Sequence, residues 1–106
     1  MDIDPRLHHY CQNIAKGQLD NVVEMYKLLG FKVVYTPPPG KFPWIMVGQP
    51  QLRFAIQVTE VDNKPIEDIE EKRKTHIAFL SDNPKEVIEK VGKWAQEKGL
   101  AFREGG

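Results

Sequence analysis

Histidine and cysteine are the residues of this chain best suited to chemistry. His8, His9 and Cys11 stand in one short segment, and His76 is the remaining histidine. Neighbouring residues of an extended strand point to opposite faces, so only one of His8 and His9 can face a given site. We prefer His9, because Tyr10 and Ile14 then point to the side where a helix must pack. Imidazole is a ligand for divalent transition metals, although either histidine could instead be held by structural hydrogen bonds.

Cys11 is expected to share a face with His9, two residues earlier on the same strand. A cysteine beside a histidine can act as a nucleophile, but a lone cysteine is more often a small apolar filler. It is the only cysteine, so no disulfide can form within the chain, which fits a reducing compartment.

Composition excludes several classes of function. The 15 basic residues balance 15 acidic ones, which gives no reason to expect nucleic acid or an anionic membrane as a partner. No apolar run approaches the ~20 residues of a membrane helix, and the amino terminus has no apolar signal-peptide core, so we expect a cytoplasmic protein. No Gly-rich phosphate loop, Gly-x-Ser-x-Gly elbow or Cys-x-x-Cys pair occurs.

The first half of the chain alternates strand and helix signals. A strand is predicted over residues 7–14, and apolar side chains recur at helical spacing over 19–29. Gly30 is placed to end that helix in a left-handed conformation. The three prolines of residues 36–40 lack N–H donors and predict a stiff, extended loop. Further strands are predicted over residues 31–35, 44–47 and 52–58.

The second half repeats part of this order. Asn83 is a good N-cap, with Pro84 at the first helical position and Glu86 placed to close a capping box. The helix that follows is expected to end at Gly99. Strands are predicted on either side of it, over residues 76–80 and 100–103.

The two halves therefore share the order strand, helix, glycine, strand, as an internal repeat does. The segment Val22-Val23-Glu24-Met25-Tyr26-Lys27-Leu28-Leu29-Gly30-Phe31 carries a helix that ends in an aromatic residue, two further residues and Leu-Gly-Phe. With Thr75-His76-Ile77-Ala78-Phe79, it resembles the glyoxalase/bleomycin-resistance (vicinal-oxygen-chelate) superfamily. The likeness covers almost the whole chain.

The resemblance implies an α+β fold in a single domain, residues 1–106, with a curved mixed sheet and helices on its convex side. A first βαβββ module spans 7–59, with its sheet in the order first, fourth, third, second strand. A charged connector follows over 60–74, as a solvated face or, alternatively, a functional lid. A second βαβ module, 75–106, is truncated by two strands. A ferredoxin-like arrangement is the alternative fold.

The family's metal ligands, carried over, fall on His9, His76 and Gln57, with Glu60 as the alternative to Gln57. The implied cofactor is a divalent ion such as zinc, nickel, iron or manganese. The implied function is a metal-dependent lyase, isomerase or dioxygenase that acts on a small oxygenated molecule in a cleft between the modules. The alternative is a non-catalytic small-ligand-binding protein of the bleomycin-resistance type.

Further residues are candidates for contact with a small-molecule ligand. Arg53 shares the predicted face of Ala55 and Gln57 and could meet an anion, although a solvent-facing arginine is the alternative. Trp44 could line a ligand site or pack in the core. Cys11 is included with them as a contact residue. Since the second module lacks two strands, an open sheet edge is expected, and a homodimer would cover it.

Overall fold

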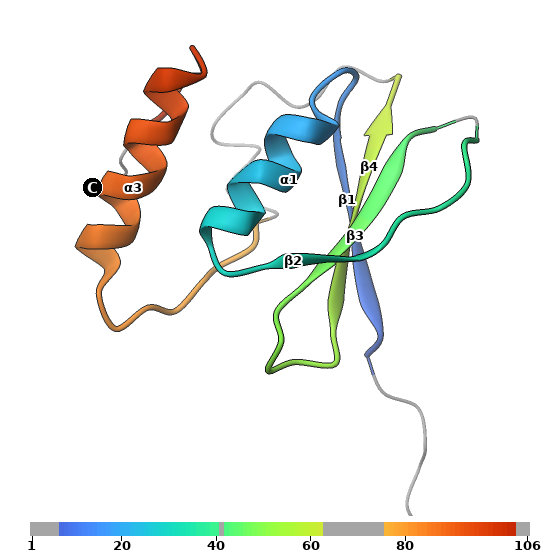
Figure 1. Ribbon diagram of the computed structural model, residues 1–106, viewed down its shortest axis with the longest axis horizontal. Coiled ribbons are helices and arrows are strands. Elements are labelled where there is room, and N and C mark those ends of the chain that lie inside the picture. Colours follow the sequence, from blue (N-terminus) through green and yellow to red (C-terminus); the bar gives the residue numbers. More distant parts are fainter. Residues whose placement is uncertain (1–6, 41, 63–75, 104–106) are drawn as a thin grey trace, which may run out of the picture. The chain divides into compact units, whose positions relative to one another are not determined.

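The protein has an α+β fold, shown by a computed structural model that describes residues 7–40, 42–62 and 76–103. The chain divides into two compact units, Met1–Pro65 and Ile66–Gly106, and each is described by itself. The first unit holds the sheet and one helix, and the second holds another helix (Figure 1). The elements are β1 (His9–Ala15), α1 (Leu19–Leu28), β2 (Lys32–Tyr35), β3 (Trp44–Gly48), β4 (Ala55–Val61) and α3 (Pro84–Glu97).

The four strands form one mixed sheet in the order β1-β4-β3-β2. β1 and β4 are parallel, while β4, β3 and β2 are antiparallel neighbours. This is the order predicted for a βαβββ module. The ferredoxin-like alternative is wrong. A βαββαβ fold needs a second helix between its third and fourth strands, whereas here β3 and β4 are joined by a turn.

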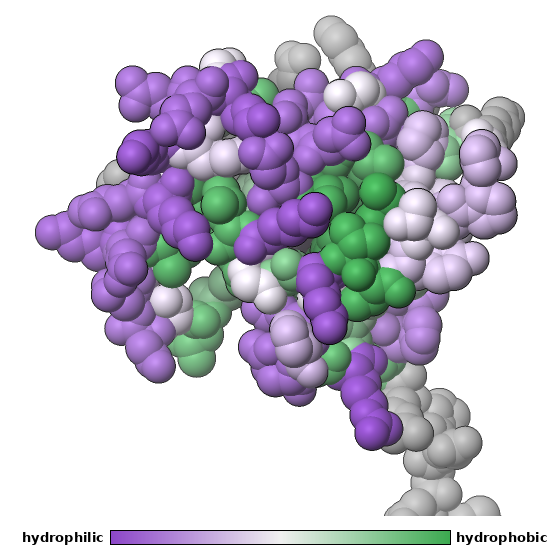
Figure 2. Space-filling model, in the orientation of Figure 1, coloured by the Kyte–Doolittle hydropathy of each residue, from purple (hydrophilic) through white to green (hydrophobic). Residues whose placement is uncertain are grey.

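Helix α1 packs on one face of this sheet, and the core lies between them. Every second residue of the central strands points to α1, as the two-residue period of a strand requires. Figure 2 shows apolar side chains gathered over the strands, while the helices carry mainly hydrophilic surface. The buried core side chains of this unit are Ile14, Leu19, Val23, Tyr26, Val47, Ile56 and Val58.

The Leu-Gly-Phe segment, residues 29–31, closes the carboxyl end of α1. Gly30 has φ +87°, a left-handed conformation that glycine adopts without a Cβ penalty. The Phe31 amide donates to the Tyr26 carbonyl at 3.0 Å, and the Gly30 amide donates to the Lys27 carbonyl at 3.1 Å. The rings of Tyr26 and Phe31 meet edge to face with centroids 5.0 Å apart. Together these contacts are the Schellman motif with its usual apolar contact.

The amino end of α1 is capped by a residue of strand β4. The N-cap residue, Gln18, makes no side-chain capping bond. Glu60 of β4 instead accepts a hydrogen bond from the Leu19 amide at 2.9 Å. The carboxylate satisfies a free N–H of the first turn and lies at the positive end of the helix dipole.

Asn83 is the N-cap of α3, as predicted, but the predicted capping box is not closed, because the Asn83 amide donates to Ser81 Oγ at 3.0 Å and not to Glu86. The Glu86 amide donates to Asn83 Oδ1 at 3.4 Å, and Asn83 Nδ2 donates to the Glu86 carboxylate at 2.7 Å. The helix ends, as predicted, at a left-handed glycine, Gly99, with φ +68°. The Leu100 amide then donates to the Ala95 carbonyl at 2.8 Å, which gives α3 the same kind of carboxyl-terminal motif as α1.

The two strands predicted beside α3 are wrong. Residues 76–80 contain no strand, and most of their side chains are exposed. Residues 100–103 also contain no strand, because this segment turns back over its own helix. The ring of Phe102 lies only 3.0 Å from where a Cβ on Gly92 would stand, so the absence of a side chain on Gly92 lets the ring approach α3.

The charged connector predicted over 60–74 begins later than expected, since Glu60 and Val61 belong to β4. Residues 63–74 of that connector lie outside the described residues. Within the part of the chain that the structure describes, no helix is long and apolar enough to cross a membrane.

Candidate functional site

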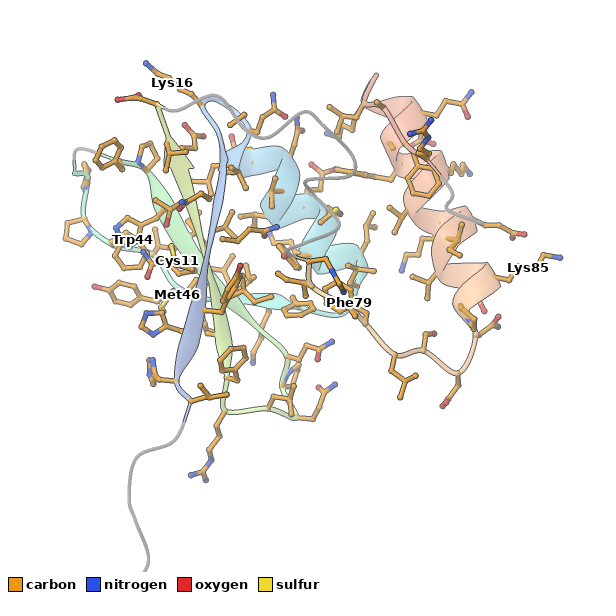
Figure 3. All side chains as sticks on the ribbon, turned by 180° about the vertical axis from the view of Figure 1, so that it is seen from behind. Cys11, Lys16, Trp44, Met46, Phe79 and Lys85 are labelled. Carbon is orange, nitrogen blue, oxygen red and sulfur yellow. The ribbon has the colours of Figure 1, made fainter. Side chains whose placement is uncertain are left out.

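The face of the sheet opposite α1, called here the open face, carries most of the side chains singled out from the sequence. Ile14 is buried and Gln12 bonds to Tyr26 of α1, so His9, Cys11 and Asn13 alternate to the other side. Figure 3 views the sheet from behind and shows Cys11, Trp44 and Met46 together on the side away from α1. The preference for His9 over its neighbour rested on this alternation, and Ile14 points to the helix as expected.

One row of side chains crosses the open face from edge to edge. The strand register pairs Cys11 with Gln57, Gln57 with Met46, and Met46 with Tyr35. Directly opposed residues have Cβ atoms only ~5 Å apart, so the members of the row are neighbours on this face, with an irregularity of the ladder just before Tyr35. A second row lies beside it and consists of Asn13, Thr59 and Trp44.

The β1 and β4 half of the open face is polar and internally hydrogen bonded. Gln57 Nε2 donates to Thr59 Oγ1 at 3.2 Å. The same hydroxyl lies 3.4 Å from Cys11 Sγ, and Cys11 Sγ donates to Asn13 Oδ1 at 3.8 Å. Cys11 is exposed, so it is not the buried apolar filler that is usual for a lone cysteine. These groups can offer donors and acceptors to a bound molecule.

The β3 and β2 half of the open face is apolar and aromatic. The rings of Tyr35 and Trp44 lie 5.6 Å apart, tilted by 31°. Met46 stands between Gln57 and Tyr35 in the row and is only half-buried. Tyr35 is 49% exposed, so its ring is available to contact another molecule. A methionine beside two aromatic rings gives a polarizable surface suited to a flat apolar group.

His8 and His9 form a pair where β1 begins, so the expectation that only one of them can face a given site is wrong. His8 precedes the strand and is not held to its alternation of faces. Their Nδ1 atoms are 2.8 Å apart, and the two rings are nearly perpendicular, at 84°. Both side chains are exposed. The main chain of the pair is fixed, because His9 opposes Ala55 in the parallel ladder and the His8 carbonyl accepts from the Ala55 amide at 3.1 Å.

Three other predicted site residues do not belong to the two rows of this face. Arg53 is exposed and precedes β4, which begins at Ala55 rather than at residue 52. Glu60 points to the α1 side, where it caps that helix, so it does not replace Gln57 as a ligand. His76 is exposed and lies in the second unit, in a segment without helix or strand.

The predicted metal ligands are only partly brought together. His9 and Gln57 share the open face, but the amide of Gln57 is bonded to Thr59 and is a weak ligand beside a carboxylate. Within residues 7–40, 42–62 and 76–103, no three His, Cys, Asp or Glu side chains gather in a group that could hold a metal ion. One imidazole and one amide do not fit a site for a transition metal on this face.

Tyr35, Met46 and Thr59 are residues of the open face that the sequence analysis did not select. Their signal lies in the register: each is a direct neighbour of a residue that was selected. A single strand shows only its own alternation, and the cross-strand partners become known once strand order and register are fixed.

No family model, curated protein or solved structure matches this chain.

Proposed function

We propose that this chain is a small-molecule-binding protein whose ligand lies on the open face of the sheet. The observation that carries the proposal is the row Cys11, Gln57, Met46 and Tyr35, which runs from polar to apolar across all four strands. It corresponds to the non-catalytic alternative that the resemblance to the bleomycin-resistance type implies. The metal-dependent glyoxalase-type enzyme, with His9, His76 and Gln57 as ligands, stays a prediction.

The division of the face indicates the chemistry of the ligand. A flat apolar body would lie over Met46 and the rings of Tyr35 and Trp44, since aromatic groups stack with such rings. A polar edge would meet Gln57 at the centre of the row. Because Gln57 Nε2 donates to Thr59, its carbonyl oxygen is the atom that accepts from a ligand hydroxyl or amine. A hydroxylated aromatic molecule has both parts.

A chemical-shift titration with catechol tests the proposal. The protein is labelled with ¹⁵N, and catechol is added up to millimolar concentration. We expect the largest shifts at the Trp44 indole N–H, the Gln57 side-chain amide and the backbone of Cys11. Shifts confined to α1, or no saturable shift at any of these groups, would rule out a binding site on the open face for this class of molecule.

We also propose that the protein is a homodimer, now on the basis of the open edges of β1 and β2. The expectation of a dimer was drawn from the two strands that the second module lacks, which would leave an open edge on the strands predicted over 76–80 and 100–103, and neither of those strands forms. In the described part of the chain, β1 pairs only with β4 and β2 pairs only with β3, so each presents an edge to which another strand could add. A second copy of the chain is the partner that two-fold association would supply.

A further inference from the structure

We propose that His8 and His9 form a chelating site for a single divalent copper ion, which shares His9 with the ligand set that the family resemblance implies but uses His8 in place of His76 and Gln57. The family set takes one histidine from the start of the first strand and His76 from the second half. The site proposed here uses two adjacent histidines and does not involve His76. It rests on the arrangement of the pair itself and is independent of the proposed ligand on the open face.

The separation of the two nitrogens sets the geometry that an ion would have. The Nδ1 atoms are 2.8 Å apart. Metal–imidazole bonds are about 2.0–2.1 Å long, so two such bonds to atoms at that separation meet at roughly 85–90°. A tetrahedral ion such as zinc needs about 109°, and therefore nitrogens roughly 3.3 Å apart. A right angle is the angle between neighbouring ligands of square-planar and octahedral ions.

The two Nδ1 atoms are already in contact, and an imidazole binds a metal in its own ring plane. Both side chains are exposed, so the rings can turn to direct the two Nδ1 lone pairs at one ion. The strand ladder holds the main chain of both residues through the contacts with Ala55. Chelation by such a pair therefore loses little conformational entropy beyond that of the two side chains.

Copper is the ion that this geometry favours. Imidazole nitrogens in a tetragonal arrangement are typical of Cu(II) and Ni(II), and Cu(II) binds most tightly among the divalent ions of the first transition series. Both histidines are exposed, so water can occupy the remaining coordination positions.

The proton balance of binding is simple. In the neutral pair, one Nδ1 carries a hydrogen and the other accepts it at 2.8 Å. The ion takes the place of that hydrogen, which moves through solvent to Nε2 of the same ring. Both rings then bind through Nδ1 as neutral imidazoles, and the neutral pair releases no net proton.

Calorimetry and electron paramagnetic resonance with Cu(II) test the site, in the full chain carrying Cys11→Ser so that the thiol neither binds nor reduces copper. We expect one ion per chain and a tetragonal spectrum with nitrogen hyperfine splitting. His8→Asn and His9→Asn should each weaken binding by at least about 10–100-fold, the loss that removal of an outer-shell partner already causes. His76→Asn, the matched control, should leave affinity unchanged.

Two results would overturn the inference. If His8→Asn binds Cu(II) as tightly as the parent, His8 is not a ligand. If His76→Asn loses as much affinity as His9→Asn, the ion is bound by the family's ligand set instead. Both histidines of the pair are exposed, and circular dichroism of each variant checks that the fold is retained.

Discussion

Tyr26 joins the helix to the sheet through a part-buried hydrogen bond. The residue is 1% exposed, and its hydroxyl donates to Gln12 Oε1 at 2.7 Å. Burial, with a smaller contribution from the charge of Tyr10, raises the pKa of Tyr26 from 10.0 to about 12. Because the pKa of Tyr26 is raised, the hydroxyl keeps its hydrogen and continues to donate to Gln12 well above pH 10.

The first prediction is that Tyr26→Phe lowers the free energy of unfolding by about 1 kcal/mol, since the bond to Gln12 is lost. The raised pKa also implies a dependence on pH. The folded state holds the proton more tightly than the unfolded chain, so stability is fully present below pH 10 and is lost as pH rises toward 12. Urea denaturation at several pH values measures both effects.

Tyr26→Phe should lose much of the alkaline decrease, while Tyr35→Phe serves as the control because Tyr35 is 49% exposed and does not contribute to the raised pKa of Tyr26. Equal stability of Tyr26→Phe and the parent at neutral pH would show that the hydroxyl contributes nothing. An alkaline decrease of the same size in both proteins would show that other groups cause it.

At the scale of elements, local signals were sufficient for three of the four ends of the two described helices. Gly30 and Gly99 end their helices as predicted, because a left-handed cap depends on a few neighbouring residues. The cap of α3 was also predicted from adjacent residues. The start of α1 was not, since its acceptor, Glu60, is 41 residues away in sequence from Leu19.

The second prediction concerns that distant cap. Glu60→Ala removes both the acceptor of the Leu19 amide and a negative charge at the helix amino end, so the free energy of unfolding should fall by about 1–2 kcal/mol. Glu60→Gln keeps an acceptor oxygen and should cost less. Denaturant midpoints measure the order of the three proteins.

Asp62→Ala is the matched control, because Asp62 is an exposed acidic residue just beyond the same strand. A midpoint for Glu60→Ala within error of that for Asp62→Ala would mean that the contact does not stabilise α1.

At the scale of the whole molecule, the first module was largely predictable and the second was not. Strand order β1-β4-β3-β2 follows from the resemblance carried by the segment around Gly30. Residues 76–80 have the composition of a strand but no strand partner in the described part of the chain, and a strand forms only when another pairs with it. The open face became clear only with the register, since its rows combine residues from four strands.

The third prediction is that the protein is a homodimer at micromolar concentration. The edges of β1 and β2 offer main-chain donors and acceptors to a second copy. Light scattering coupled to size exclusion measures the mass, and twice the chain mass of 12.2 kDa is expected. A constant 12.2 kDa across the concentration range, with one cooperative unfolding transition, would refute the dimer.

The central claim is that a ligand lies on the open face, and a comparison of two tyrosines tests it most directly. Tyr35 and Tyr10 are almost equally exposed, at 49% and 48%, but Tyr35 belongs to the row on the open face and Tyr10 alternates to the α1 side. The affinity for catechol is measured for Tyr35→Ala and Tyr10→Ala by the same titration. We predict that Tyr35→Ala loses affinity about tenfold or more, where tenfold equals about 1.4 kcal/mol, and that Tyr10→Ala changes the affinity little. Equal affinities in the two variants, or a larger loss for Tyr10→Ala, would contradict the account.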